Sequence, residues 1–202
     1  MSTMLSVIGA EPFEIEFGSF LKQMSDEEFF DFCQRNRDWR IERTKEGDII
    51  IMPPTGTKSG GRNFELTVSF GIWARQDGTG KGFDSSTGFT LPNGATRSPD
   101  LAWVRKDRWE ALSEQEQKKF SPLCPDFVVE LRSATDSLSR LQAKMDEYME
   151  NGAELGWLID PSERKVYIYR KLSDIEIMDD PQIISGEPTL RGFALDVRAL
   201  WD

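Results

Sequence analysis

Two carboxylates and one lysine in the middle of the chain have the residue types and spacing of a catalytic site. Asp100 follows a proline at the start of the apolar run 101–104, and Glu130 lies near the end of the apolar run 127–131. A carboxylate on a buried strand needs a partner, because removing its water is costly. If the two strands are adjacent, both carboxylates can converge on one hard cation such as Mg²⁺.

A lysine completes this set from the helix predicted after the second strand. A helix from Leu138 to about Asn151 would begin at a Thr135 or Asp136 cap and end at Asn151-Gly152. Lys144 precedes Tyr148 by four residues and therefore lies at the edge of the apolar face. That face is formed by Leu138, Leu141, Met145, Tyr148 and Met149.

The composition excludes several kinds of chemistry. The 202 residues include no histidine, which removes Ser-His-Asp and Cys-His mechanisms, His-ligated zinc and imidazole acid–base catalysis. Catalysis would depend on carboxylates, lysine, hydroxyls and a metal ion held by oxygen. The net charge of −10 argues against extensive nucleic-acid binding. However, residues 35–62 hold seven basic and four acidic residues, so a basic rim on an acidic body is an open alternative.

The length predicts one domain over residues 1–202, with an N-terminal extension of about residues 1–40. Cys33 and Cys124 are isolated and lack metal-type spacing, which fits a reducing, cytoplasmic compartment. No apolar run approaches the roughly 20 residues of a membrane span, and no secretory signal is visible. We therefore expect a cytoplasmic protein without a membrane partner.

The remaining pattern predicts a mixed α/β sheet flanked by helices. In the N-terminal part we expect a strand around Phe13–Phe17, a helix capped by Ser25 and Glu28, and a hairpin within 41–52. A long helix after Gly61 would run to about Gln76, with Phe64, Val68 and Ile72 as its spine and Leu66, Phe70 and Trp73 widening the buried face. Strands are expected within 81–92, 101–104, 127–131, 156–170, 175–178 and 192–197, a hairpin turn at 93–94 and a short charged helix at 114–119.

Five segments resemble a known family. They are FDSSTGFTLPNG at 83–94, RSPDLAW at 97–103, PDFVVELRS at 125–133, the K-x-x-x-Y of 144–148 and GWLIDP at 156–161. Together they resemble the Uma-two family of restriction-endonuclease-like proteins, within the PD-(D/E)xK nuclease superfamily. The resemblance runs from about Ile50 to Trp201. It implies a restriction-endonuclease-like αβββαβ core, here with an added N-terminal helix and hairpin, and magnesium-dependent hydrolysis of phosphodiesters.

The resemblance assigns roles residue by residue. Asp100 matches the superfamily's PD aspartate and Glu130 its second metal-binding acid. The backbone carbonyl of Leu131 would complete the protein's share of the metal shell. Each acid also has a plainer interpretation: a Pro-Asp pair before a strand is often a turn, and Glu130 could be a core carboxylate paired with Arg132 or Lys144.

The sequence departs from the superfamily pattern at its lysine. That lysine is expected two residues after the second acid, where this chain has Arg132. A guanidinium stays protonated and cannot act as a base, so Lys144 is the natural replacement, with a pKa that burial beside a metal would lower. Arg132 should point to the same face as Glu130. Glu65 on the long helix is a weaker candidate, and Tyr148 should reach the site with its hydroxyl.

The leading hypothesis is a metal-dependent endonuclease acting on nucleic acid, most simply DNA, with Mg²⁺ as cofactor and Mn²⁺ as a substitute. Water positioned by the metal and Lys144 would attack the phosphate in line. A homodimer is expected, supported by exposed aromatic residues such as Trp39 or Trp109. The alternatives are a catalytically inactive nuclease-fold protein with a DNA-binding or regulatory role, and a two-carboxylate glycosidase.

Overall fold

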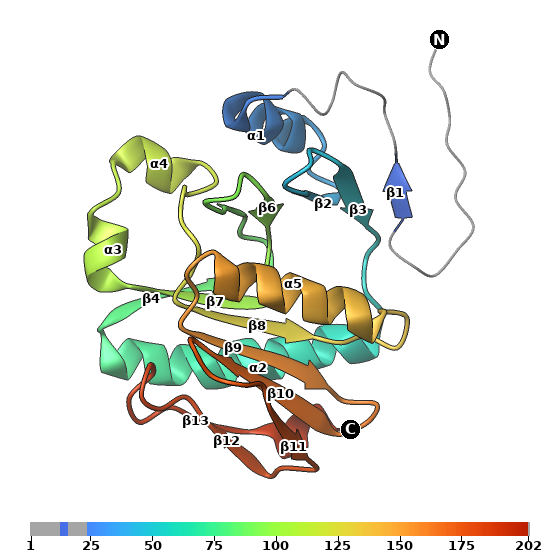
Figure 1. The fold of residues 1–202 in the computed structure, drawn as a ribbon, viewed down its shortest axis with the longest axis vertical. Coiled ribbons are helices and arrows are strands. Elements are labelled where there is room, and N and C mark those ends of the chain that lie inside the picture. Colours follow the sequence, from blue (N-terminus) through green and yellow to red (C-terminus); the bar gives the residue numbers. More distant parts are fainter. Residues whose placement is uncertain (1–12, 16–23, 202) are drawn as a thin grey trace.

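The computed structural model describes residues 13–15 and 24–201. Its centre is a six-stranded mixed sheet in the order β11-β10-β9-β8-β7-β4, covered by one long helix on each face (Figure 1). The strands are β4 (Gly80–Asp84), β7 (Leu101–Arg105), β8 (Phe127–Leu131), β9 (Leu155–Asp160), β10 (Lys165–Arg170) and β11 (Glu176–Asp179). Only the β8–β9 pair of this sheet is parallel.

Two helices complete the predicted core order. Helix α2 (Thr57–Asp77) precedes β4, and α5 (Leu138–Glu150) connects the parallel strands β8 and β9. A parallel pair needs a crossover of this kind, because a tight turn joins only antiparallel strands. The succession α2-β4-β7-β8-α5-β9 is the predicted αβββαβ core.

Alternation along β8 sends its side chains to both layers. Phe127 and Val129 pack in the core beneath α2, whereas Val128 packs with Met145 and Tyr148 of α5. All five residues of β8 are buried. Glu130 shares the face of Val128, so the strand directs this carboxylate toward the α5 side of the sheet.

A second sheet, in the order β1-β3-β2-β6-β5, lies beside the first (Figure 1). It contains the predicted hairpin, β2 (Arg40–Arg43) and β3 (Ile49–Met52), and joins it to β5 (Phe89–Thr90) and β6 (Thr96–Arg97). The strand expected at 13–17 is present as β1 (Phe13–Ile15), and its last two residues lie outside the described residues. Helix α1 (Asp26–Arg35) has the predicted Ser25–Glu28 capping box.

The remaining elements include a two-stranded sheet and a 3₁₀ helix that add buried residues to the core beneath α2. They are α3 (Lys106–Glu110), α4 (Glu114–Lys118), β12 (Ile183–Ser185), β13 (Ala194–Asp196) and the 3₁₀ helix η2 (Val197–Leu200). Of these, α4 and a strand within 192–197 were expected, whereas α3 and β12 were not. Within the described parts of the chain, no helix is both long and apolar enough to cross a membrane.

The buried face of α2 differs from the prediction. The expected spine of Phe64, Val68 and Ile72 is exposed, at 65%, 39% and 59% respectively. Leu66 and Phe70, which were predicted to widen the buried face, are buried, and the centroid of the Phe70 ring lies 5.9 Å from that of Phe127. Both stripes have helical spacing, so periodicity alone could not decide which one faces the sheet.

Two smaller details at helix ends also differ. Helix α2 begins at Thr57, so Gly60 and Gly61 lie inside it. The N-cap residue of α5 is Ser137, which makes no side-chain cap hydrogen bond, whereas the Asp136 carboxylate accepts a hydrogen bond from the Ser133 amide at 2.8 Å. Gly152 follows the C-cap Asn151 with φ of +108°, as predicted for the end of this helix.

Truncation of the two aromatic stripes of α2 tests this assignment. Phe70→Ala should lower the free energy of unfolding by about 3–5 kcal/mol, because it opens a cavity beneath the sheet. Phe64→Ala, six residues earlier on the same helix, should change it by about 0.5 kcal/mol or less. Urea unfolding of both variants measures the difference. Equal losses would show that the exposed stripe is buried in solution.

Candidate active site

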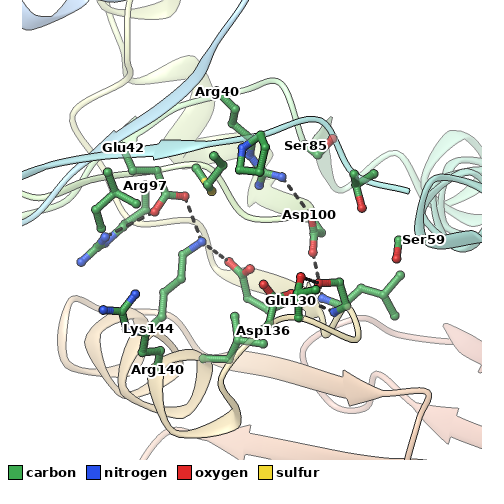
Figure 2. A pocket seen from close by; sticks show the side chains of 18 of the residues that line it. Arg40, Glu42, Ser59, Ser85, Arg97, Asp100, Glu130, Asp136, Arg140 and Lys144 are labelled. Carbon is green, nitrogen blue, oxygen red and sulfur yellow. Dashed lines mark hydrogen bonds and ion pairs between the residues drawn. The ribbon is translucent and has the colours of Figure 1, made fainter. Parts of the chain in front are cut away.

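Asp100 and Glu130 are held side by side by two neighbouring strands. Strands β7 and β8 pair antiparallel with Leu101 opposite Val129, and extending this register by one residue places Asp100 opposite Glu130. Facing residues of neighbouring strands point to the same side of the sheet. Both residues are buried, with 8% and 3% exposure, and both line the cleft shown in Figure 2.

The Asp100 carboxylate has two nitrogen partners. Its Oδ2 accepts a hydrogen bond from the backbone amide of Leu131 at 2.8 Å, and its Oδ1 lies 3.3 Å from Nη1 of Arg40. The contact with Leu131 brings the backbone of that residue beside Asp100. The Leu131 N–H group makes this contact, whereas the prediction concerned the Leu131 carbonyl as a metal ligand. Leu131 itself lines the cleft.

Glu130 receives both partners that helix α5 was expected to supply. Its Oε1 lies 2.8 Å from Nζ of Lys144 and accepts a hydrogen bond from the Tyr148 hydroxyl at 3.0 Å. Burial raises the pKa of Glu130 to about 7; Asp100 adds to this effect and Lys144 opposes it. Lys144, rather than Arg132, is the cation paired with this carboxylate.

The Lys144 ammonium lies between two carboxylates. It is 2.8 Å from Glu130 and 2.9 Å from Glu42, and its side chain is 13% exposed. Burial alone would lower the pKa of Lys144, but the two carboxylates outweigh it and the pKa is raised. Between these two carboxylates Lys144 is a charged hydrogen-bond donor, and the lowering expected beside a bound metal stays a prediction.

Glu42 is a site residue that the sequence reasoning missed. Its Oε1 accepts from Lys144 and from the backbone amide of Ser98, each at 2.9 Å, and its Oε2 lies 3.3 Å from Nη1 of Arg97. Burial would raise the pKa of Glu42, yet the cations Lys144, Arg97 and Arg40 lower it to about 2. Glu42 is thus a charged carboxylate inside the protein.

The signal for Glu42 was present in the sequence as an alternation of residues. In Arg40-Ile41-Glu42 the isoleucine packs in the core under α1, and the two charged residues line the cleft. A strand places such alternate side chains on opposite faces. What the sequence did not reveal is that β2 pairs with β6, the strand just before Asp100.

Two predicted site residues lie elsewhere. Arg132 donates from Nη1 to Asp160 Oδ2 at 2.6 Å and from Nε to the Asp136 carbonyl at 3.1 Å. It follows the end of β8, so strand alternation no longer fixes its direction, and the fully buried Asp160 is its partner. Glu65 is exposed on α2, whereas Ser59 and Asn63 of that helix line the cleft.

The cleft has a volume of about 1140 Å³. One wall is the β2–β3 hairpin, and the other is formed by residues 133–136 and helix α5 (Figure 2). Nine acidic and five basic residues line it. This surplus of negative charge disfavours a bare phosphate backbone and favours a cation.

The donor set fits one magnesium ion. Among the described residues no group of three His, Cys, Asp or Glu side chains could hold a metal. Mg²⁺ commonly takes one or two carboxylates and keeps several waters. Asp100 and Glu130, with the carbonyl of Leu131, match that requirement, whereas a fully protein-built cage is not formed.

An αβββαβ core with paired acids on its second and third strands defines a restriction-endonuclease-like protein. The sequence model of the Uma2 family, described as "Putative restriction endonuclease", matches residues 26–198, and the chain belongs to this family. A search of curated proteins gave no match.

A solved structure supports the fold. It is the crystal structure of "a putative nuclease belonging to DUF820 from Anabaena variabilis ATCC 29413". The TM-score is 0.68 at 21% sequence identity, and the match covers 80% of this chain and 89% of the other. The predicted fold class is therefore confirmed.

Replacement of Glu42 should alter the pH dependence of stability. A carboxylate with a folded pKa of about 2 stabilises the protein above its unfolded pKa, and this stabilisation is lost as the pH falls from about 4.5 toward 2. Glu42→Gln should lower the free energy of unfolding by roughly 3 kcal/mol near pH 7 and by less near pH 3.5. Urea unfolding across this range measures the difference.

The control is Glu46→Gln in the same hairpin. Glu46 also lines the cleft, but its side chain is 58% exposed, so its replacement should change stability by about 0.5 kcal/mol or less at either pH. A Glu42→Gln loss that does not diminish toward acid pH would contradict the charged state assigned to Glu42.

Proposed function

We propose that this protein is a magnesium-dependent endonuclease that hydrolyses phosphodiester bonds of DNA. The observation that carries the proposal is the pair of neighbouring buried carboxylates, Asp100 and Glu130, facing one cleft beside the charged Lys144. Membership of a family described as a "Putative restriction endonuclease" supports nuclease activity. The acidic cleft supports a requirement for a cation before phosphate can approach.

In this proposal Asp100, Glu130 and the Leu131 carbonyl hold Mg²⁺, and Mn²⁺ substitutes for it. The bound ion supplies Lewis acidity toward the phosphodiester. The two strands keep the carboxylates in register, so little rearrangement of the backbone is needed to bind it. Tyr148 orients Glu130 through its hydroxyl hydrogen bond.

Lys144 acts as a fixed positive donor. Its proton stays on Nζ because Glu130 and Glu42 hold the ammonium, and the charge stabilises negative charge that develops on the phosphate. A positively charged donor aimed in advance at the reacting group avoids reorganisation during the reaction. The general-base role considered for Lys144 is therefore replaced by an electrostatic one.

Three further expectations accompany this function. We propose that the chain forms one domain, because β2 pairs with β6 across the sequence, and that it acts in the cytoplasm. A homodimer is also proposed. Trp39 is 53% exposed, whereas Trp109 is partly buried against Phe83, with ring centroids 5.1 Å apart, and offers a smaller surface.

Divalent ions and site variants test the metal site. Mg²⁺ or Mn²⁺ at millimolar concentration should raise the melting temperature of the wild type, because the ion binds only the folded state. Asp100→Asn and Glu130→Gln should abolish this rise while melting cooperatively in EDTA. If neither ion changes the melting temperature of the wild type, the proposed metal site is wrong.

Cleavage assays test the role of Lys144. With Mn²⁺ and labelled DNA, as a duplex and as a single strand, Lys144→Met should slow cleavage at least about 100-fold while keeping the Mn²⁺-induced rise in melting temperature. Lys118→Met is the matched control, because Lys118 is exposed and paired with Glu114 outside the cleft. Binding of DNA by the wild type without cleavage would favour the inactive, regulatory alternative.

A further inference from the structure

Arg40 is the cation that faces Asp100 across the cleft. It begins β2, and its Nη1 lies 3.3 Å from Oδ1 of Asp100 while its Nη2 donates to the backbone carbonyl of Ser98. Its Nε is buried and has no hydrogen-bond partner. The side chain lines the cleft and is 33% exposed (Figure 2).

A metal ion that binds Oδ1 of Asp100 must compete with Arg40, which is paired with that oxygen. The other oxygen, Oδ2, accepts the backbone N–H of Leu131. A divalent cation on Oδ1 and a guanidinium at the same atom would repel each other strongly in a buried site. Metal binding to Oδ1 therefore requires the guanidinium of Arg40 to move.

Arg40 and Lys144 would respond differently to a metal ion. Lys144 has two carboxylate partners, so it stays paired with Glu42 when Glu130 turns to the ion. For Arg40, the ion pair with Asp100 is the only one with a carboxylate among the described residues. A displaced Arg40 would therefore lose this direct ion pair and keep the longer-range attraction of Glu42 and Glu130.

We propose that Arg40 is a substrate-binding residue that pairs with Asp100 in the metal-free protein and binds the phosphate of the nucleic acid once a metal occupies Asp100. This inference rests on the proposed metal site. The planar fork of a guanidinium matches two phosphate oxygens, and the unpartnered Nε adds a donor. Arg40 would link metal loading to substrate binding.

The proposal predicts opposite effects of one substitution. Arg40→Gln should bind Mn²⁺ about tenfold more tightly than the wild type in the absence of substrate, because a competing positive charge is gone. The same variant should bind a fluorescently labelled oligonucleotide about tenfold more weakly in the presence of Ca²⁺. Calorimetry measures the first affinity and fluorescence anisotropy the second.

Lys45→Gln is the matched control. It removes one positive charge from the same cleft, but Lys45 is 55% exposed and lies 4.0 Å from Glu46. Its affinity for Mn²⁺ should stay within about twofold of the wild type, because an exposed charge is screened by solvent. A tenfold gain in this variant as well would overturn the proposal in favour of a general effect of net charge.

The remaining outcomes separate this inference from the proposed function. Failure of the wild type to bind Mn²⁺ would overturn both. Binding by the wild type with unchanged or weaker affinity in Arg40→Gln, or unchanged oligonucleotide binding, would overturn only the role of Arg40. If Arg40→Gln does not melt cooperatively in EDTA, Arg40→Lys replaces it. A single ammonium cannot bridge Asp100 and Ser98 as the forked guanidinium does, so this variant should bind Mn²⁺ about threefold more tightly than the wild type. An unchanged Mn²⁺ affinity would overturn the role of Arg40.

Discussion

The Lys144 ammonium, buried between Glu130 and Glu42, is the interaction on which the site depends. It joins three elements that are distant in sequence: helix α5, strand β8 and strand β2. Two carboxylates buried this deeply would be costly without a cation between them. The same contact therefore stabilises the packing of the N-terminal sheet against the central sheet and fixes the position of the lysine.

Charges of opposite sign continue outward from this contact. Glu42 also binds Arg97 of β6, and Arg97 binds Glu147 of α5 at 2.5 Å, which ties the lysine-bearing helix to the N-terminal sheet a second time. On the other side Arg40 pairs with Asp100. Glu42, Asp100 and Glu130 each have a protein cation as partner, so a metal ion that binds Asp100 and Glu130 exchanges partners rather than filling an empty acidic pocket.

The sequence predicted the part of the site that depends on local rules. Asp100 and Glu130 follow from two strands in register, and Lys144 and Tyr148 follow from helical spacing; the structure brings all four into contact or onto facing positions. The predicted direction of the Arg132 side chain was wrong, because the alternation of side chains ends with the strand. Arg40 and Glu42 were missed because only the pairing of β2 with β6 carries them to the cleft, and local patterns do not reveal such long-range pairing. The face of α2 was ambiguous because Phe64 and Phe70 belong to stripes with the same period.

The position of the lysine and the presence of Glu42 are physically connected. In the superfamily pattern the lysine follows the second acid on the same strand, whereas here Arg132 has that place and neutralises Asp160 at the end of β9. A lysine on α5 must reach the acids from the neighbouring layer, and its long side chain has many conformations to lose. Glu42 compensates by fixing the ammonium from the opposite side of the cleft. Strand β2 is therefore part of the candidate site, because a lysine on the helix needs a second carboxylate to hold it.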